Sequence, residues 1–210
     1  FGGIHNAMRT TRSAIRLGLA GMYMEDQAMP KRCPFIGGGQ VVPTATMVQK
    51  LRAAIRVREE EGSDFVIIAR TYAGRVHSMG EAIERGIAYA QAGADAIFVD
   101  LGYTDEVVED LRNIAKQIGP HAHVVANMTE TVGRPLLTAE ELQGMGFKIV
   151  IYPLTALMTA AGALAVVMAE LKSKGTTRNV VDRLMPLSEL TELIGIHRYR
   201  QIETELGDDI

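Results

Sequence analysis

The chain has 210 residues, of which 47% are hydrophobic and 22% charged, which is enough apolar sequence for the core of one domain. Its net charge of −3 gives no broad attraction for nucleic acid, and it contains no polybasic block of the kind that anchors proteins to membranes. Its single cysteine, Cys33, cannot form an internal disulfide. We therefore expect a cytoplasmic protein with neither nucleic acid nor membrane as a partner.

Short apolar runs rich in β-branched residues recur along the chain and predict strands. They are "LAGMYM" (19–24), "FVIIAR" (65–70), "AIFVD" (96–100), "HVVAN" (123–127) and "KIVIYP" (148–153). Segments with helical periodicity lie between them. Residues 46–62 place Val48, Leu51, Ala54 and Ile55 on one face, and residues 78–93 do the same with Ala82, Ile83, Ile87 and Ala90. Glycines in "AGAD" and "GMGF" are expected to end two of the helices.

Regular alternation of strands and helices is typical of an α/β protein with a parallel sheet, either a (β/α)8 TIM-type barrel or a doubly wound sheet. Polar or turn-forming groups follow each predicted strand, which favours a barrel because its strand ends converge on one mouth. A complete barrel has eight strands, so about three are missing from the five predicted here. We assign residues 1–175 to the barrel portion.

The uncharged stretch 149–169 is long enough to test as a membrane span. Pro153 divides it, however, into a β-branched piece and an Ala/Leu/Met-rich piece, which predict a buried strand and a core helix. Residues 176–210 carry no strand signal and predict a helical extension, broken near Pro186 and Gly195. With Leu190, Leu193 and Ile194 to bury, this extension is expected to pack on a neighbouring subunit or across the outside of the barrel.

Three strand ends carry candidate site residues, each with a structural alternative. Glu25 and Asp26 could bind Mg²⁺ or Mn²⁺, or could cap a helix or pair with Lys31 or Arg32. Arg70 ends an apolar strand, so its charge must meet a carboxylate, belonging either to a substrate or to Glu25 or Asp100. Asn127 could orient a carboxylate or cap its own turn. The five histidines show no ligand or triad spacing.

Cys33 is a candidate acid or base. The charges of Lys31 and Arg32 favour its thiolate, and Gly37 to Gly39 in the following "PFIGGGQVVP" are typical of a hinge or lid. The alternative is an inert buried thiol. The glycines do not form a phosphate-binding loop, because "GGGQ" lacks the Lys-Ser/Thr pair and the strand-to-helix context.

Several motifs in order resemble the isocitrate lyase/phosphoenolpyruvate mutase superfamily, in particular its methylisocitrate lyase and dimethylmalate lyase branch. They are "MEDQAMPKRC", "FVIIARTYA", "AIERGIAYAQAGADAIFVD", "NMTETVGRPLLTAEEL" and "IVIYPLTAL". The resemblance implies a barrel that exchanges its last helix between the subunits of a tetramer. It also implies a Mg²⁺ or Mn²⁺ ion that holds a 2-oxo acid or its enolate.

The resemblance also implies residue roles. Glu25 corresponds to the Glu that contacts metal-bound water, Cys33 to the acid/base that protonates the leaving enolate, and Arg70 to the Arg that binds a substrate carboxylate. The other substrate-binding positions expected from it are Asp100, Asn127, Thr129 and Thr155. The chain departs from the pattern with Pro34-Phe35 for Gly-His, Tyr72 for Asp, Asp100 for Glu, and Met158 for a common Arg.

The implied activity is Mg²⁺-dependent carbon-carbon cleavage of a 2-hydroxy di- or tricarboxylate to a 2-oxo acid and a second carboxylate. Phosphonopyruvate or oxaloacetate chemistry is the enzymatic alternative, although Cys33 argues against the mutase branch. A degenerate barrel without catalysis is the other. The D-x-D metal motif of the superfamily is represented only by its tail, "FGG" at residues 1–3, so either the metal ligands precede residue 1 or the chain lacks them.

Overall fold

The computed structural model describes residues 2–33, 38–101, 106–131 and 133–207, so Pro34 and Phe35 lie outside the described residues. It divides into two compact units, Phe1–Leu154 and Thr155–Ile210. The barrel portion 1–175 assigned from the sequence stays a prediction.

The first unit is built on one parallel sheet of five strands, and each predicted run forms one of them. The strands are β1 (Gly21–Glu25), β2 (Val66–Thr71), β3 (Ala96–Val99), β4 (His123–Asn127) and β5 (Ile149–Ile151). Their order in the sheet is their order in the chain. A doubly wound sheet reverses direction at a switch point, whereas a barrel adds each strand next to the last. The sheet is therefore half of a barrel, as predicted.

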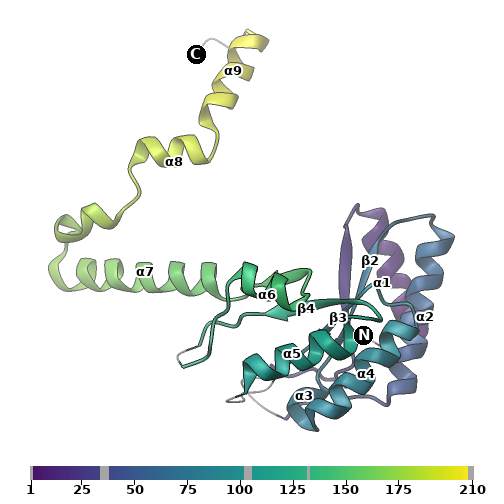
Figure 1. Ribbon diagram of the computed structural model, residues 1–210. Helices are drawn as coiled ribbons and strands as arrows, with labels where there is room; N and C mark the ends of the chain where they lie inside the picture. The colour runs from purple at the N-terminus through teal and green to yellow at the C-terminus, as the bar shows by residue number, and fades with distance from the viewer. Residues whose placement is uncertain (1, 34–37, 102–105, 132, 208–210) are drawn as a thin grey trace. The chain divides into compact units, whose positions relative to one another are not determined.

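The helices of the first unit alternate with the strands, beginning with one that precedes β1. They are α1 (Ile4–Arg16), α2 (Thr44–Glu60), α3 (Ala73–Val76), α4 (Met79–Gln91), α5 (Val107–Ile118) and α6 (Ala139–Met145). In Figure 1 α2, α4 and α5 run side by side, and each packs against the next. The predicted glycine ends are confirmed, because Gly93 and Gly146 follow α4 and α6 with φ of 102° and 104°.

The main core lies between the helices and the outer face of the sheet. Alternate strand residues point to this side, including the fully buried Ile67, Ile97 and Val124. The face of α2 is rotated slightly from the prediction. Leu51 and Ala54 are buried as expected, but Met47 and Val57 complete the buried stripe, while Val48 and Ile55 lie at its margin.

A buried polar cluster centred on Asp26 connects β1 to its neighbours. The Asp26 carboxylate is fully buried and accepts hydrogen bonds from Thr71 Oγ1 and the Tyr72 N–H, both at 2.8 Å. It also accepts from Tyr89 Oη at 2.8 Å and Arg85 Nη1 at 3.3 Å, both on α4. Burial, and secondarily the charge of Asp26, raises the pKa of Tyr89, so the phenol stays a donor.

The second unit is helical and is described by itself. It contains α7 (Thr155–Lys174), a 3₁₀ helix η1 (Arg178–Arg183), α8 (Leu187–Leu193) and α9 (Ile196–Leu206). The predicted breaks are confirmed, because Pro186 precedes α8 and Gly195 precedes α9.

The division of residues 149–169 into strand and helix is also confirmed, and the burial of the helix in a core stays a prediction. No residue of α7 is buried within the described chain, and Leu157 and Leu164 are 67% and 60% exposed. By length and composition α7 could cross a membrane, although core helices of other proteins pass the same test.

The Asp26 cluster generates a stability prediction. Asp26→Ala leaves the charge of Arg85 buried without this partner, so the free energy of unfolding should fall by about 3–5 kcal/mol. Denaturant unfolding followed by circular dichroism measures this change. Asp64→Ala, at an exposed position, is the control and should change the value by less than about 0.5 kcal/mol. Equal effects of the two substitutions would contradict the role of the cluster.

Candidate functional site

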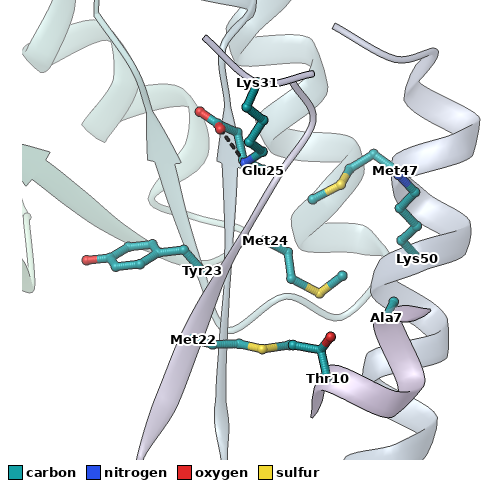
Figure 2. Close-up of a pocket in the computed structure, with 9 residues that line it drawn as sticks. All are labelled: Ala7, Thr10, Met22, Tyr23, Met24, Glu25, Lys31, Met47 and Lys50. Carbon is teal, nitrogen blue, oxygen red and sulfur yellow. Dashed lines mark hydrogen bonds and ion pairs between the residues drawn. The ribbon is translucent and has the colours of Figure 1, made fainter. Parts of the chain in front are cut away.

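The alternation of side chains along the strands places the predicted site residues on the inner face of the half-barrel. Glu25 ends β1 and lies opposite Arg70 of β2 in the sheet register. Asp100 follows β3 directly, and Asn127 ends β4 opposite Ile151. Because all these strands are parallel, their carboxyl ends meet at one edge of the sheet. Figure 2 shows the alternation on β1, where Tyr23 points to one side and Met22 and Met24 point to the other, toward α1 and α2.

Arg70 is the centre of the site and pairs with both carboxylates. Its Nη2 donates a short hydrogen bond to Asp100 Oδ2, and its Nε lies 3.1 Å from Glu25 Oε1. The second contact lacks hydrogen-bond geometry, so we treat it as an ion pair. The guanidinium also lies over the Phe98 ring, 4.7 Å from its centre, a cation–π contact. The structural alternative foreseen for Arg70 is therefore present in full.

Two further cations extend this ion pair at either end. Lys31 Nζ lies 2.6 Å from Glu25 Oε2, as Figure 2 shows, which confirms the alternative partner predicted for Glu25. Arg75 Nε lies 2.6 Å from Asp100 Oδ1. The two carboxylates are well buried, with 10% and 2% of their side chains exposed. Three cations thus contact two carboxylates at the strand ends.

A cleft of about 280 Å³ opens beside these residues. Its lining combines apolar residues of the inner face with polar groups from the strand ends. They are Tyr23, Arg70, Arg75, Phe98, Asp100, Asn127, Thr129, Ile151, Pro153 and Leu154. Apolar walls with a few convergent polar groups are typical of a small-molecule site. A smaller cavity, of about 70 Å³, is lined by residues of α1, β1 and α2 together with Lys31, and three of them are methionines, Met22, Met24 and Met47 (Figure 2).

Asn127 has an unsatisfied group in this cleft. Its Oδ1 atom is buried and has no hydrogen-bond partner among the described residues. Buried polar atoms rarely stay unpaired, so a ligand hydroxyl or ammonium group would fit this acceptor. Thr129, which is 3% exposed, lies two residues further on and also lines the cleft.

The remaining predicted residues lie elsewhere. Cys33 is exposed, and the described residues that line the cleft do not include it. Its segment is nevertheless linked to the site through Lys31. Thr155 begins α7 in the second unit, so its role at the cleft stays a prediction. Asp26 is not a metal candidate, because its carboxylate is fully occupied by the buried cluster on the outer face.

Sequence reasoning missed Arg75 and the aromatic residues of the cleft. Arg75 belongs to the short helix α3, which follows β2 directly, and a basic residue so close to a strand end was the available signal. Tyr23 and Phe98 pack edge to face with ring centres 5.9 Å apart. They stand one layer below the polar strand ends, and period-two alternation along β1 and β3 could have placed them there.

The superfamily resemblance implies a divalent metal, and the described residues do not by themselves fit one. They include no group of three or more His, Cys, Asp or Glu side chains that could hold an ion. Both inner-face carboxylates, Glu25 and Asp100, already contact two cations each. Hard divalent ions need several free oxygen ligands. The assignment of Glu25 to a metal site therefore stays a prediction.

Comparison with known proteins gives a consistent result. The family model described as phosphoenolpyruvate phosphomutase matches residues 1–172. The 2,3-dimethylmalate lyase of Eubacterium barkeri is 37% identical over 97% of this chain and 68% of its own length. The 2-methylisocitrate lyase of Aeropyrum pernix is 35% identical over 99% of this chain and 64% of its own length. The chain thus spans about two thirds of the length of these relatives.

Solved structures agree with the sequence relatives. Oxaloacetate acetylhydrolase bound to the inhibitor 3,3-difluorooxalacetate matches 99% of this chain and 68% of its own, with a TM-score of 0.86 and 31% identity. Phosphonopyruvate hydrolase in complex with oxalate and Mg²⁺ matches 97% of this chain and 69% of its own, with a TM-score of 0.81 and 29% identity. The resemblance found in the motifs is confirmed: the chain belongs to the phosphoenolpyruvate mutase/isocitrate lyase superfamily.

Proposed function

We propose that this chain carries the carboxylate-binding part of the active site of a carbon-carbon lyase. The reaction is the cleavage of a 2-hydroxy di- or tricarboxylate, of the methylisocitrate or dimethylmalate type, to a 2-oxo acid and a second carboxylate. The observation that carries the proposal is that Arg70 and Arg75 line the same cleft as Asn127, whose side-chain oxygen has no hydrogen-bond partner among the described residues. The names of the two sequence relatives support the same reaction.

Arg70 and Arg75 bind a substrate carboxylate in this proposal. Both are held by Asp100, which fixes their guanidinium planes before the substrate arrives. Fixed guanidinium groups suit carboxylates because they present paired donors in one plane. The Asn127 oxygen then accepts a hydrogen bond from the substrate hydroxyl, and the Thr129 hydroxyl contributes a second polar contact in the same wall.

Cleavage moves electrons in one direction through the substrate. A base takes the hydroxyl proton, the C–O bond becomes a carbonyl, and the electrons of the broken C–C bond form the enolate of the leaving carboxylate. The Cys33 thiol gives its proton to that carbon, which completes the second product. Cys33 lies two residues after Lys31, whose ion pair with Glu25 attaches this segment to the end of β1. The segment that carries the proposed acid is therefore connected to the site.

The requirement for Mg²⁺ or Mn²⁺ is part of the proposal as a property of the superfamily. A structural relative is described in complex with oxalate and Mg²⁺.

We also propose the tetramer with exchanged C-terminal helices, in the cytoplasm. The support is the apolar surface of the second unit, whose side chains are largely exposed within the described chain. This surface includes Leu157, Leu164, Leu187, Leu190, Leu193 and Ile194. Exposed apolar side chains gathered in this way are typical of a subunit interface.

The role of Arg70 predicts weaker ligand binding in a conservative variant. Arg70→Lys keeps the charge but removes the planar fork, and should raise the Kd for oxalate about 10- to 100-fold. Calorimetric titration of the full-length protein with oxalate measures the change. Arg56→Lys, on the exposed face of α2, is the control and should leave the Kd unchanged. An unaltered Kd in Arg70→Lys would remove Arg70 from the binding site.

The reaction itself is tested with a substrate panel. Full-length protein should release 2-oxo acid from methylisocitrate or dimethylmalate with Mg²⁺ present, and this activity should disappear when EDTA is added. Cys33→Ser should lower kcat by about 10²- to 10⁴-fold, the usual contribution of a positioned acid. Turnover of oxaloacetate or phosphonopyruvate by the Cys33→Ser variant would instead favour the other branches of the superfamily. The absence of activity with every substrate of the panel would refute the lyase assignment.

The assembly predicts a defined mass in solution. Light scattering on the full-length protein should give a tetramer, and the double variant Leu190→Asp/Leu193→Asp should dissociate because it puts charge into the proposed interface. The matched control Ser188→Asp/Gln201→Asp adds the same charge at exposed polar positions and should stay tetrameric. A monomeric wild-type protein would show that this surface is covered in another way.

A further inference from the structure

We infer that Gln27 is the positioning residue for Cys33, an inference that rests on the proposed function. Gln27 lies two residues after the end of β1, and only 6% of its surface is exposed. Its side-chain amide makes two hydrogen bonds with the main chain of Arg32. Nε2 donates to the Arg32 carbonyl at 3.0 Å, and Oε1 accepts from the Arg32 N–H at 3.1 Å. One amide thus satisfies both main-chain polar groups of the residue before Cys33.

The segment that carries Cys33 leaves and re-enters the fold beside Gln27. Gln27 forms an isolated antiparallel bridge with Val41. Two main-chain hydrogen bonds flank this bridge, from Ala28 N to the Gln40 carbonyl at 2.6 Å and from Val42 N to the Asp26 carbonyl at 2.8 Å. Residues 40–42 are therefore fixed beside the end of β1, and the Gln27 side chain extends from there to Arg32, the residue before Cys33.

Close packing holds the Gln27 amide in place. A Cβ atom built on Gly39 would lie 2.8 Å from Gln27 Nε2 and 2.4 Å from Cε1 of the Tyr72 ring. No side chain fits at residue 39, so the returning main chain passes directly over the amide and the ring. The Tyr72 N–H is in turn fixed by Asp26. The position of the amide thus depends on the buried cluster of the fold.

Gln27 and Glu25 hold successive residues of the same arm. Glu25 binds the Lys31 side chain, and Gln27 binds the Arg32 main chain, so both residues before Cys33 are attached to the end of β1. The first attachment is an ion pair in the proposed site, while the second is neutral and partly buried. A neutral attachment fixes the main chain without adding charge near the thiol. We therefore assign to Gln27 a role that acts only through the placement of Cys33.

The test uses Gln27→Met in the full-length protein, because Met keeps the length and packing of the side chain and loses both hydrogen bonds. Tryptic cleavage after Arg32, read by mass spectrometry without substrate, should become at least 10-fold faster. With the hydroxy acid that the wild-type protein cleaves, kcat should fall about 10- to 100-fold while KM changes less than 3-fold. Gln40→Met, whose exposed side chain makes no hydrogen bond within the described residues, is the matched control and should match wild type in both assays.

A double-mutant cycle separates positioning from a general structural role. In the Cys33→Ser background, Gln27→Met should have no further effect on kcat, because the group that it positions is gone. An equal loss in both backgrounds, or unchanged cleavage after Arg32, would overturn the inference. If the wild-type protein turned over no substrate of the panel, the proposed function and the positioning role would both be refuted. Faster cleavage in Gln27→Met would then still identify the attachment of Arg32 as a purely structural one.

Discussion

The buried carboxylate of Asp26 is the constraint on which the rest of the first unit depends. A charge removed from water must be compensated in full, and Asp26 is compensated by groups from three other places: the end of β2, the start of the segment after it, and α4. These bonds fix the carboxyl ends of β1 and β2 relative to each other and to the helix layer. Glu25 directly precedes Asp26, and Arg70 directly precedes Thr71, so the cluster also fixes the main chain of these two site residues.

The candidate site is an electrostatic chain built on that fixed base. Its cations and carboxylates alternate from Lys31 through Glu25, Arg70 and Asp100 to Arg75. Each carboxylate is shared by two cations, so an arriving substrate carboxylate competes for guanidinium groups that are already oriented. Rearrangement within such a chain costs less than bringing a free arginine out of water, because the desolvation has already occurred on folding.

Much of this arrangement could be predicted from the sequence, and what was missed has a physical reason. Continuous apolar runs predicted all five strands, since strands covered on one face and facing a barrel interior on the other stay apolar throughout. The strand ends then predicted Glu25, Arg70, Asp100 and Asn127. The buried pairing of Asp26 with Tyr89 and Arg85 was not predictable, because 59 and more residues separate the partners in sequence. The residues that cover α7 are not predictable either, because composition does not say which chain covers an apolar helix.

Glu25 and Asp26 are neighbours in sequence but belong to opposite sides of the sheet, and this has a consequence for how β1 can change. Asp26 faces the helices and belongs to the buried cluster, whereas Glu25 faces the inner side of the half-barrel and pairs with Arg70. Deleting or inserting one residue within β1 would turn every later side chain of the strand to the opposite face of the sheet. Asp26 would then face the inner side and Glu25 the helices. The length of this five-residue strand can therefore change only by an even number of residues if the two carboxylates are to keep their faces. A change of two residues preserves the assignment of faces, and a change of one abolishes it.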